Sequence, residues 1–78
     1  MMYQDRIIVD PEILAGKPVV RGTRIPVELV LKRLAQDLTV ARLFEAYPRL
    51  TEEDVKACIE YAQALVEGEE VYLTTPVP

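Results

Sequence analysis

The hydrophobic positions from Val27 to Leu38 repeat with the period of an α-helix. Apolar side chains recur every three or four residues, which places them on one side of a helix. They are Val27, Val30, Leu31, Leu34, Ala35 and Leu38. Pro26 occupies the first-turn position that proline favours, so a helix with one buried face is predicted from residue 27. Leu29 lies on the polar side of that helix, where a monomer gives it nothing to pack against.

Two more helices follow from the same pattern. A short one is predicted after Thr39, which suits an N-cap, and it ends before Pro48 because the residue preceding a proline avoids the helical region. Its shared apolar face is Val40, Leu43, Phe44 and Tyr47. A third helix is predicted from Thr51, whose side chain can cap the first turn. Glu52, Glu53 and Asp54 then place negative charge at the positive end of the helix dipole.

The third helix is apolar around most of its circumference. One stripe, which we expect to face the core, is Val55, Cys58, Ile59, Ala62, Leu65 and Val66, and a second stripe is Ala57, Tyr61 and Ala64. A helix of this kind is covered on more than one side. Either another chain covers the second stripe or the N-terminal arm does. Gly68 is expected to end the helix, and Val71, Tyr72 and Leu73 are expected to form a short edge strand.

Residues 6–26 read as an extended arm that contains a small β-hairpin. The β-branched runs Ile7–Val9 and Val19–Val20 are bounded by glycine and proline, which is typical of short strands joined by turns. The whole chain is predicted to be one domain, residues 1–78, with the arm at 6–26, a helical part at 27–67 and a C-terminal tail at 68–78. At this length the core is thin, so oligomerisation or a partner protein is expected to add stability.

Composition argues against catalysis. The 78 residues include one cysteine and no histidine, which removes histidine bases and the commonest zinc ligand. Cys58 falls on the expected core face and is interpreted as a buried hydrophobe. We therefore expect no enzyme activity, no catalytic residue, no metal site and no cofactor. The start of the chain lacks a signal peptide and no apolar run is long enough to span a membrane, which favours the cytoplasm.

Charge is distributed unevenly along the chain. The net charge is -4, yet residues 1–42 carry two more basic than acidic residues and residues 43–78 carry six more acidic than basic. Three of the cations, Lys17, Arg21 and Arg24, fall within eight residues of the turn-rich arm. Guanidinium groups on a stiff loop suit carboxylate or phosphate partners. The structural alternative is that these cations pair with acids of the same domain.

Three stretches of the chain resemble domain-of-unknown-function family 433, a small bacterial family. They are Ile8–Ile13, Gly16–Val27 and Tyr47–Val55, and the likeness runs from about residue 7 to residue 64. The resemblance implies a mainly α fold: a three-helix, homeodomain-like (helix-turn-helix) bundle with a short N-terminal β-hairpin arm. It also implies an antitoxin that neutralises a PIN-like nuclease. Residues 36–38 depart from the family, whose members usually carry a glycine in this turn.

Three functions are weighed for the chain. As an antitoxin-like binding protein, it would insert the arginine loop into the carboxylate cluster of a PIN-like nuclease. The partner-binding residues would be Lys17, Arg21, Arg24, Leu29, Tyr61, Val71, Tyr72 and Leu73. As a helix-turn-helix regulator of DNA, it would use Lys17, Arg21, Arg24, Lys32 and Arg33, because three acids at the start of the third helix repel phosphates. As a self-assembling domain, it would form a homo-oligomer, expected to be a dimer, through the third helix.

Overall fold

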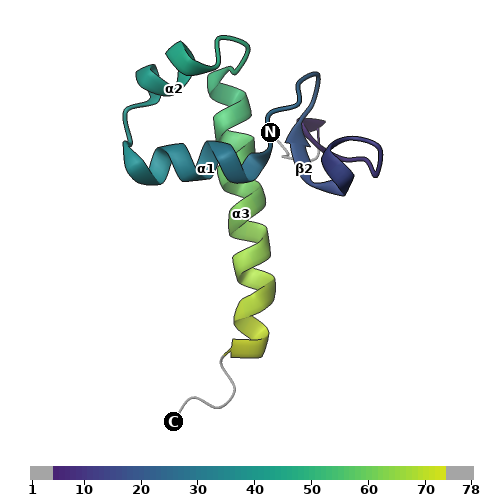
Figure 1. Cartoon of the computed structure of the whole chain (residues 1–78). Helices are drawn as coiled ribbons and strands as arrows, with labels where there is room; N and C mark the ends of the chain where they lie inside the picture. Colours follow the sequence, from purple (N-terminus) through teal and green to yellow (C-terminus); the bar gives the residue numbers. More distant parts are fainter. Residues whose placement is uncertain (1–4, 74–78) are drawn as a thin grey trace.

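The structure, a computed structural model, describes residues 5–73 of the chain, with side chains described for residues 5–68. The prediction of a mainly α chain with an N-terminal hairpin and three helices is confirmed (Figure 1). In chain order the elements are β1 (Ile7–Val9), the 3-10 turn η2 (Leu14–Gly16), β2 (Pro18–Val20), α1 (Val27–Gln36), α2 (Val40–Ala46) and α3 (Glu52–Leu73).

The arm folds into the predicted hairpin. β1 and β2 are antiparallel, with Ile7 opposite Val20 and Val9 opposite Pro18. Successive side chains of a strand point to opposite faces, yet neighbouring Val19 and Val20 are both fully buried. Both faces of β2 are therefore covered. Val19 also forms an isolated bridge to Pro26, which ties the hairpin to the start of α1.

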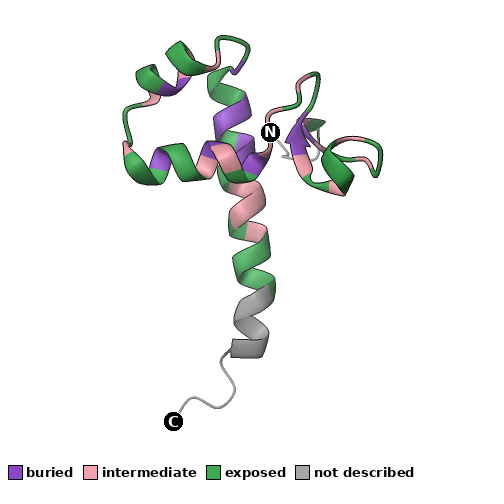
Figure 2. Ribbon diagram, viewed as in Figure 1, coloured by how far each residue is buried: buried purple, intermediate pink, exposed green. Residues whose placement is uncertain are grey.

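The core lies where α1 crosses the N-terminal half of α3. β1 contacts α3, β2 contacts α1, and α2 contacts α1 on the side away from the hairpin (Figure 1). The buried residues, coloured purple on the ribbon in Figure 2, concentrate in this region. The main cluster consists of Ile7, Val20, Val27, Val30, Leu34, Leu43, Leu50, Val55, Ala57 and Cys58.

The first helix ends two residues earlier than its apolar repeat predicts. α1 stops at Gln36, and Asp37 is extended with φ -157° and ψ 112°. Leu38 was expected to be buried but is 81% exposed, and Ala35 is also exposed. The Asp37 carboxylate accepts the backbone N–H of Thr39 at 2.9 Å. Such an aspartate turn reverses the chain without a positive φ, so the glycine usual in the family is not needed here.

Thr39 occupies the N-cap position of α2, but its side chain makes no capping hydrogen bond. The predicted N-cap position is therefore confirmed, although the hydroxyl does not cap the helix. Of the predicted apolar face, Leu43 is buried, while Phe44 and Tyr47 are half-buried and pack against the core cluster.

The third helix is longer than predicted. Gly68 does not end it, because α3 continues to Leu73, and the predicted strand at Val71, Tyr72 and Leu73 is wrong since their backbone is helical. A glycine inside a helix costs only about 1 kcal/mol relative to alanine, and the glutamates on both sides of Gly68 favour the helical state. The side chains of residues 69–73 and all of residues 74–78 lie outside the described part.

Candidate functional site

The turn between β2 and α1, residues 20–25, is held by a set of internal hydrogen bonds. The Thr23 hydroxyl donates to the Val20 carbonyl oxygen at 2.8 Å and accepts the Ile25 backbone N–H at 3.0 Å. The Val20 and Thr23 backbone N–H groups donate to the carbonyls of Ile25 and Val20. Gly22 has φ +79°, a conformation that glycine adopts most easily. The turn is therefore a rigid platform.

Arg21 and Arg24 project from this platform into solvent. Both residues are exposed, and neither guanidinium makes a hydrogen bond or ion pair with another side chain or carbonyl of residues 5–68. Arg21 lines a hollow together with Asp5, Arg6 and Asp54, but Asp54 is already paired with Arg6 at 3.1 Å. Among the side chains of residues 5–68, no acid forms an ion pair with Arg21 or Arg24.

Lys17, the third cation predicted to bind a partner, forms an exposed ion pair within the domain. The Lys17 ammonium lies 2.8 Å from a carboxylate oxygen of Glu28, and both side chains are exposed. An exposed pair of this kind contributes between about 0 and 1 kcal/mol, so Lys17 remains available to a stronger partner.

The guanidinium carbon of Arg33 lies 5.8 Å from the centre of the Tyr47 ring, which is within the range of a cation–π contact.

Leu29 and Lys32 belong to the outer face of α1. Leu29 is half-buried and Lys32 is exposed, and both line a shallow hollow with Pro26 and Glu28. Lys17 is paired with Glu28, which lines the same hollow as Lys32. Of the residues assigned to a nucleic-acid surface, Lys17 and Lys32 therefore lie near one another. Arg21 and Arg24 occupy the separate turn after β2.

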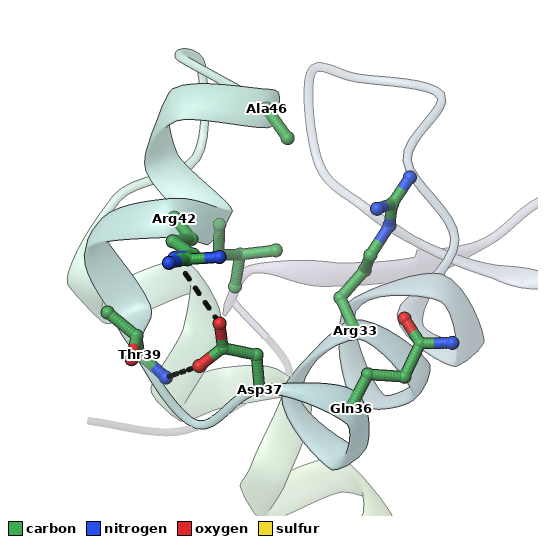
Figure 3. A pocket seen from close by; sticks show the side chains of 7 residues that line it. Arg33, Gln36, Asp37, Thr39, Arg42 and Ala46 are labelled. Atoms are coloured by element: carbon green, nitrogen blue, oxygen red, sulfur yellow. Dashed lines mark hydrogen bonds and ion pairs between the residues drawn. The ribbon is translucent and has the colours of Figure 1, made fainter.

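A third hollow, with a cavity volume of about 200 Å³, lies between α1 and α2 (Figure 3). Figure 3 shows the Asp37 carboxylate between the Thr39 backbone and Arg42, whose guanidinium nitrogen lies 3.4 Å away. The Thr39 N–H, with a smaller contribution from Arg42, holds the pKa of the Asp37 carboxyl below its usual range. Arg42 is thus engaged in bracing the turn between the helices.

The start of α3 carries a reciprocal capping box. The Asp54 backbone N–H donates to the Thr51 hydroxyl at 3.1 Å, and the Thr51 backbone N–H donates to an Asp54 carboxylate oxygen at 3.0 Å. This confirms the predicted cap at Thr51. Glu52 and Glu53 are exposed. An exposed acidic helix start is poorly suited to meeting DNA phosphates, so α3 does not make a convincing DNA-reading helix.

The two apolar stripes of α3 are not covered as predicted. In the stripe expected to face the core, Val55 and Cys58 are buried, but Ile59, Leu65 and Val66 are 49%, 54% and 61% exposed. In the second stripe, Ala57 is fully buried by the domain itself, and half-buried Tyr61 packs against the core cluster. The reason is that the domain surrounds only the N-terminal half of α3 (Figure 2). The uncovered apolar surface therefore lies beside Tyr61, at Ile59, Leu65 and Val66.

Cys58 is fully buried. Burial, followed by the negative charge of Asp54, raises the pKa of its thiol to about 12. Such a thiol carries very little thiolate near neutral pH, which is the form that reacts.

No group of three or more His, Cys, Asp or Glu side chains able to hold a metal ion occurs among the described residues. Within the same part of the chain, no helix is long and apolar enough to cross a membrane.

We expect the Cys58 thiol of the folded protein to react with iodoacetamide at pH 8 about 1000-fold more slowly than the thiol of the unfolded chain. The rise of the pKa to about 12 suppresses the thiolate, and burial blocks access. Labelling followed by mass spectrometry with and without urea measures the ratio. Equal rates in both states would show that the thiol is accessible and contradict its assignment to the core.

A family model described as "Protein of unknown function (DUF433)" matches residues 7–62, which confirms the resemblance found in the sequence. An uncharacterised protein of Sinorhizobium fredii (strain NBRC 101917 / NGR234) is 46% identical over 54 residues, which are 69% of this chain and 24% of that protein. The chain thus spans about a quarter of the length of that relative.

Two further similarities concern an archaeal protein and a solved structure. An uncharacterised protein of Archaeoglobus fulgidus (strain ATCC 49558 / DSM 4304 / JCM 9628 / NBRC 100126 / VC-16) is 54% identical over 24 residues, covering 31% of this chain and 67% of that one. The crystal structure of a DUF433 member protein from Anabaena variabilis ATCC 29413 matches with a TM-score of 0.74 and 29% identity. The match covers 92% of this chain and 71% of that chain.

Proposed function

The chain belongs to the DUF433 family of proteins of unknown function, and from this premise we propose that it is an antitoxin-like protein that binds and neutralises a PIN-like nuclease. The observation that carries the proposal is the braced turn at residues 20–25 with its two exposed guanidiniums. PIN-like nucleases hold their catalytic metal with a cluster of carboxylates. Arginine pairs with carboxylates through two parallel hydrogen bonds, so Arg21 and Arg24 have the chemistry to occupy such a cluster.

The rigidity of the turn favours this role. Binding costs the freedom of the groups that become ordered, and a loop already held in one conformation loses less on association. Thr23 supplies two of the bonds that fix the turn, and the Arg21 backbone N–H donates to the Arg6 carbonyl at 2.7 Å. The backbone from which both arginine side chains extend is therefore already ordered before any partner arrives. The proposal includes that the nuclease acts in the cytoplasm, so it also assigns this protein to the cytoplasm.

The test is charge reversal in the turn. We expect the variant Arg21→Glu/Arg24→Glu to bind a PIN-like nuclease encoded beside its gene at least about 100-fold more weakly. Each lost charge-assisted hydrogen bond is worth about 1.5–3 kcal/mol, and the new carboxylates add repulsion. Growth under co-expression and a titration of nuclease activity with purified chain measure the effect.

The matched control carries the same change of charge on other faces of the molecule. Arg49 and Lys56 are both exposed and are not among the residues assigned to partner or nucleic-acid binding, so Arg49→Glu/Lys56→Glu should retain neutralisation within a few-fold. Full protection by Arg21→Glu/Arg24→Glu would overturn the proposed function. An equal loss of neutralisation in the control would show that the net charge of the chain, and not the turn at residues 20–25, determines binding.

A further inference from the structure

The C-terminal half of α3 presents an apolar face that the described part of the chain leaves uncovered. Ile59, Leu65 and Val66 are 49%, 54% and 61% exposed. Figure 1 shows α3 continuing well past α1, α2 and the hairpin, and Figure 2 shows its burial decreasing along that course. These apolar side chains stay in contact with water in the single chain, and burying them against a second surface would be favourable.

The spacing of the apolar residues identifies the kind of surface. Val55, Ile59, Ala62 and Val66 follow one another at intervals of four, three and four residues, which is the heptad spacing that a second helix matches by supercoiling. Val55 is covered by the domain itself, whereas the seam from Ile59 to Val66 continues beyond it. We propose that a second copy of this chain covers this seam, in an antiparallel pair of α3 helices.

The absence of charged residues along the seam favours a second copy. In a two-fold interface, residues near the axis meet their own counterparts, so a charge there repels itself. All six residues from Tyr61 to Val66 are uncharged, and Glu60 and Glu67 flank this stretch. At 3.6 residues per turn, Glu60 and Glu67 lie on the side of the helix away from the seam. The small side chain of Ala62 at the centre lets two helices approach closely.

The position of the domain body favours the antiparallel order. α1, α2 and the hairpin surround the N-terminal half of α3, so a parallel pair would place two bodies and two acidic helix starts side by side. An antiparallel pair centred on Ala62 places the bodies at opposite ends. It sets Ile59 level with Leu65 and Val66 of the second copy, so the exposed apolar side chains of the two helices lie at the same height.

Sedimentation of the full chain tests the pair without any nuclease. The seam is shorter than the interfaces of about 1,200–2,000 Å² that hold stable complexes, so we expect a dimer that dissociates at micromolar concentrations. The sedimenting mass should rise from monomer to dimer between about 1 µM and 1 mM. The variant Leu65→Glu/Val66→Glu should associate at least about 100-fold more weakly, because it buries carboxylates at the seam.

The matched control inserts the same charges elsewhere. Ala41 and Ala46 are exposed on α2, so Ala41→Glu/Ala46→Glu should dimerise like the unaltered chain. If circular dichroism shows that the glutamate variant at the seam has lost its fold, the milder Leu65→Gln/Val66→Gln replaces it, with the same weakened association expected. A chain that stays monomeric to about 1 mM overturns the proposal, as does a dimer that a folded seam variant leaves unchanged.

Cysteine cross-linking tests the orientation. Under mild oxidation, Ala62→Cys should form an intermolecular disulfide, because the two-fold axis brings this position to its own copy. Ile59→Cys should not, since its counterpart lies at the far side of the axis. Efficient cross-linking at both positions would indicate a parallel pair and overturn the antiparallel arrangement. Because neither experiment involves Arg21 or Arg24, failure of the pair and failure of nuclease binding are separate results.

Discussion

Leu43→Ala is expected to lower the free energy of unfolding by about 2–5 kcal/mol, whereas Leu38→Ala should change it by less than about 0.5 kcal/mol. The two substitutions remove the same atoms, from side chains that are 4% and 81% exposed. Leu43 is the buried residue of α2, so its truncation leaves a cavity beneath that helix. A domain of this length has a total stability of about 4–12 kcal/mol, and the loss would be a large part of it.

Urea denaturation followed by circular dichroism measures both values. The protein concentration should be low, at about 1 µM, because self-association would add to the apparent stability of the native state. Similar destabilisation by both substitutions would show that Leu38 is packed against something in solution. No effect of Leu43→Ala would contradict the placement of α2 on the core.

The contrast between Leu38 and Leu43 shows what hydrophobic periodicity can predict. Both residues continue an apolar repeat, and the repeat correctly identified the helices that carry or precede them. It did not identify the end of α1, because that end depends on a side chain. The Asp37 carboxylate bonds to the Thr39 backbone N–H and Arg42 braces it from the next helix. These contacts take Leu38 out of the helical face.

Which residues of α3 are buried could not be predicted from the sequence, for a different reason. A repeat tells which residues share a face, but it does not tell what stands opposite that face. Ala57 is buried because α3 packs closely at its N-terminal half, and Leu65 is exposed because nothing in the described chain reaches its level. Only the placement of the whole domain along the helix distinguishes the two.

The candidate site was partly predictable. The clustering of Lys17, Arg21 and Arg24 between glycines and prolines indicated a stiff cationic loop, and the turn at residues 20–25 has that form. The pairing of Lys17 with Glu28 joins residues that are 11 positions apart, and no local pattern indicates it. Nor does any pattern indicate the positive φ angles of Leu14 and Ala15, 50° and 57°, in the connection between the strands.

Asp54→Ala is expected to lower the free energy of unfolding by about 2–3 kcal/mol, because it removes a charged hydrogen-bond acceptor that two buried or half-buried groups share. Asp54 is 7% exposed. Its carboxylate accepts the Thr51 backbone N–H at 3.0 Å and pairs with Arg6 at 3.1 Å. The effect falls below that of a fully buried pair, since the Arg6 side chain is 38% exposed and water can replace part of the lost contact.

The neighbouring Glu53 provides the matched control for Asp54. It is an exposed acid in the same helical turn, so Glu53→Ala should change stability by less than about 0.5 kcal/mol. A double-mutant cycle with Arg6→Leu isolates the ion pair, and a coupling energy near zero would contradict its contribution.

Because the Arg6 carbonyl accepts the Arg21 backbone N–H, Asp54 also anchors the arm on which the arginine turn is built. Loss of this anchor should therefore weaken nuclease binding at temperatures where the domain remains folded, and Glu53→Ala should leave that binding unchanged.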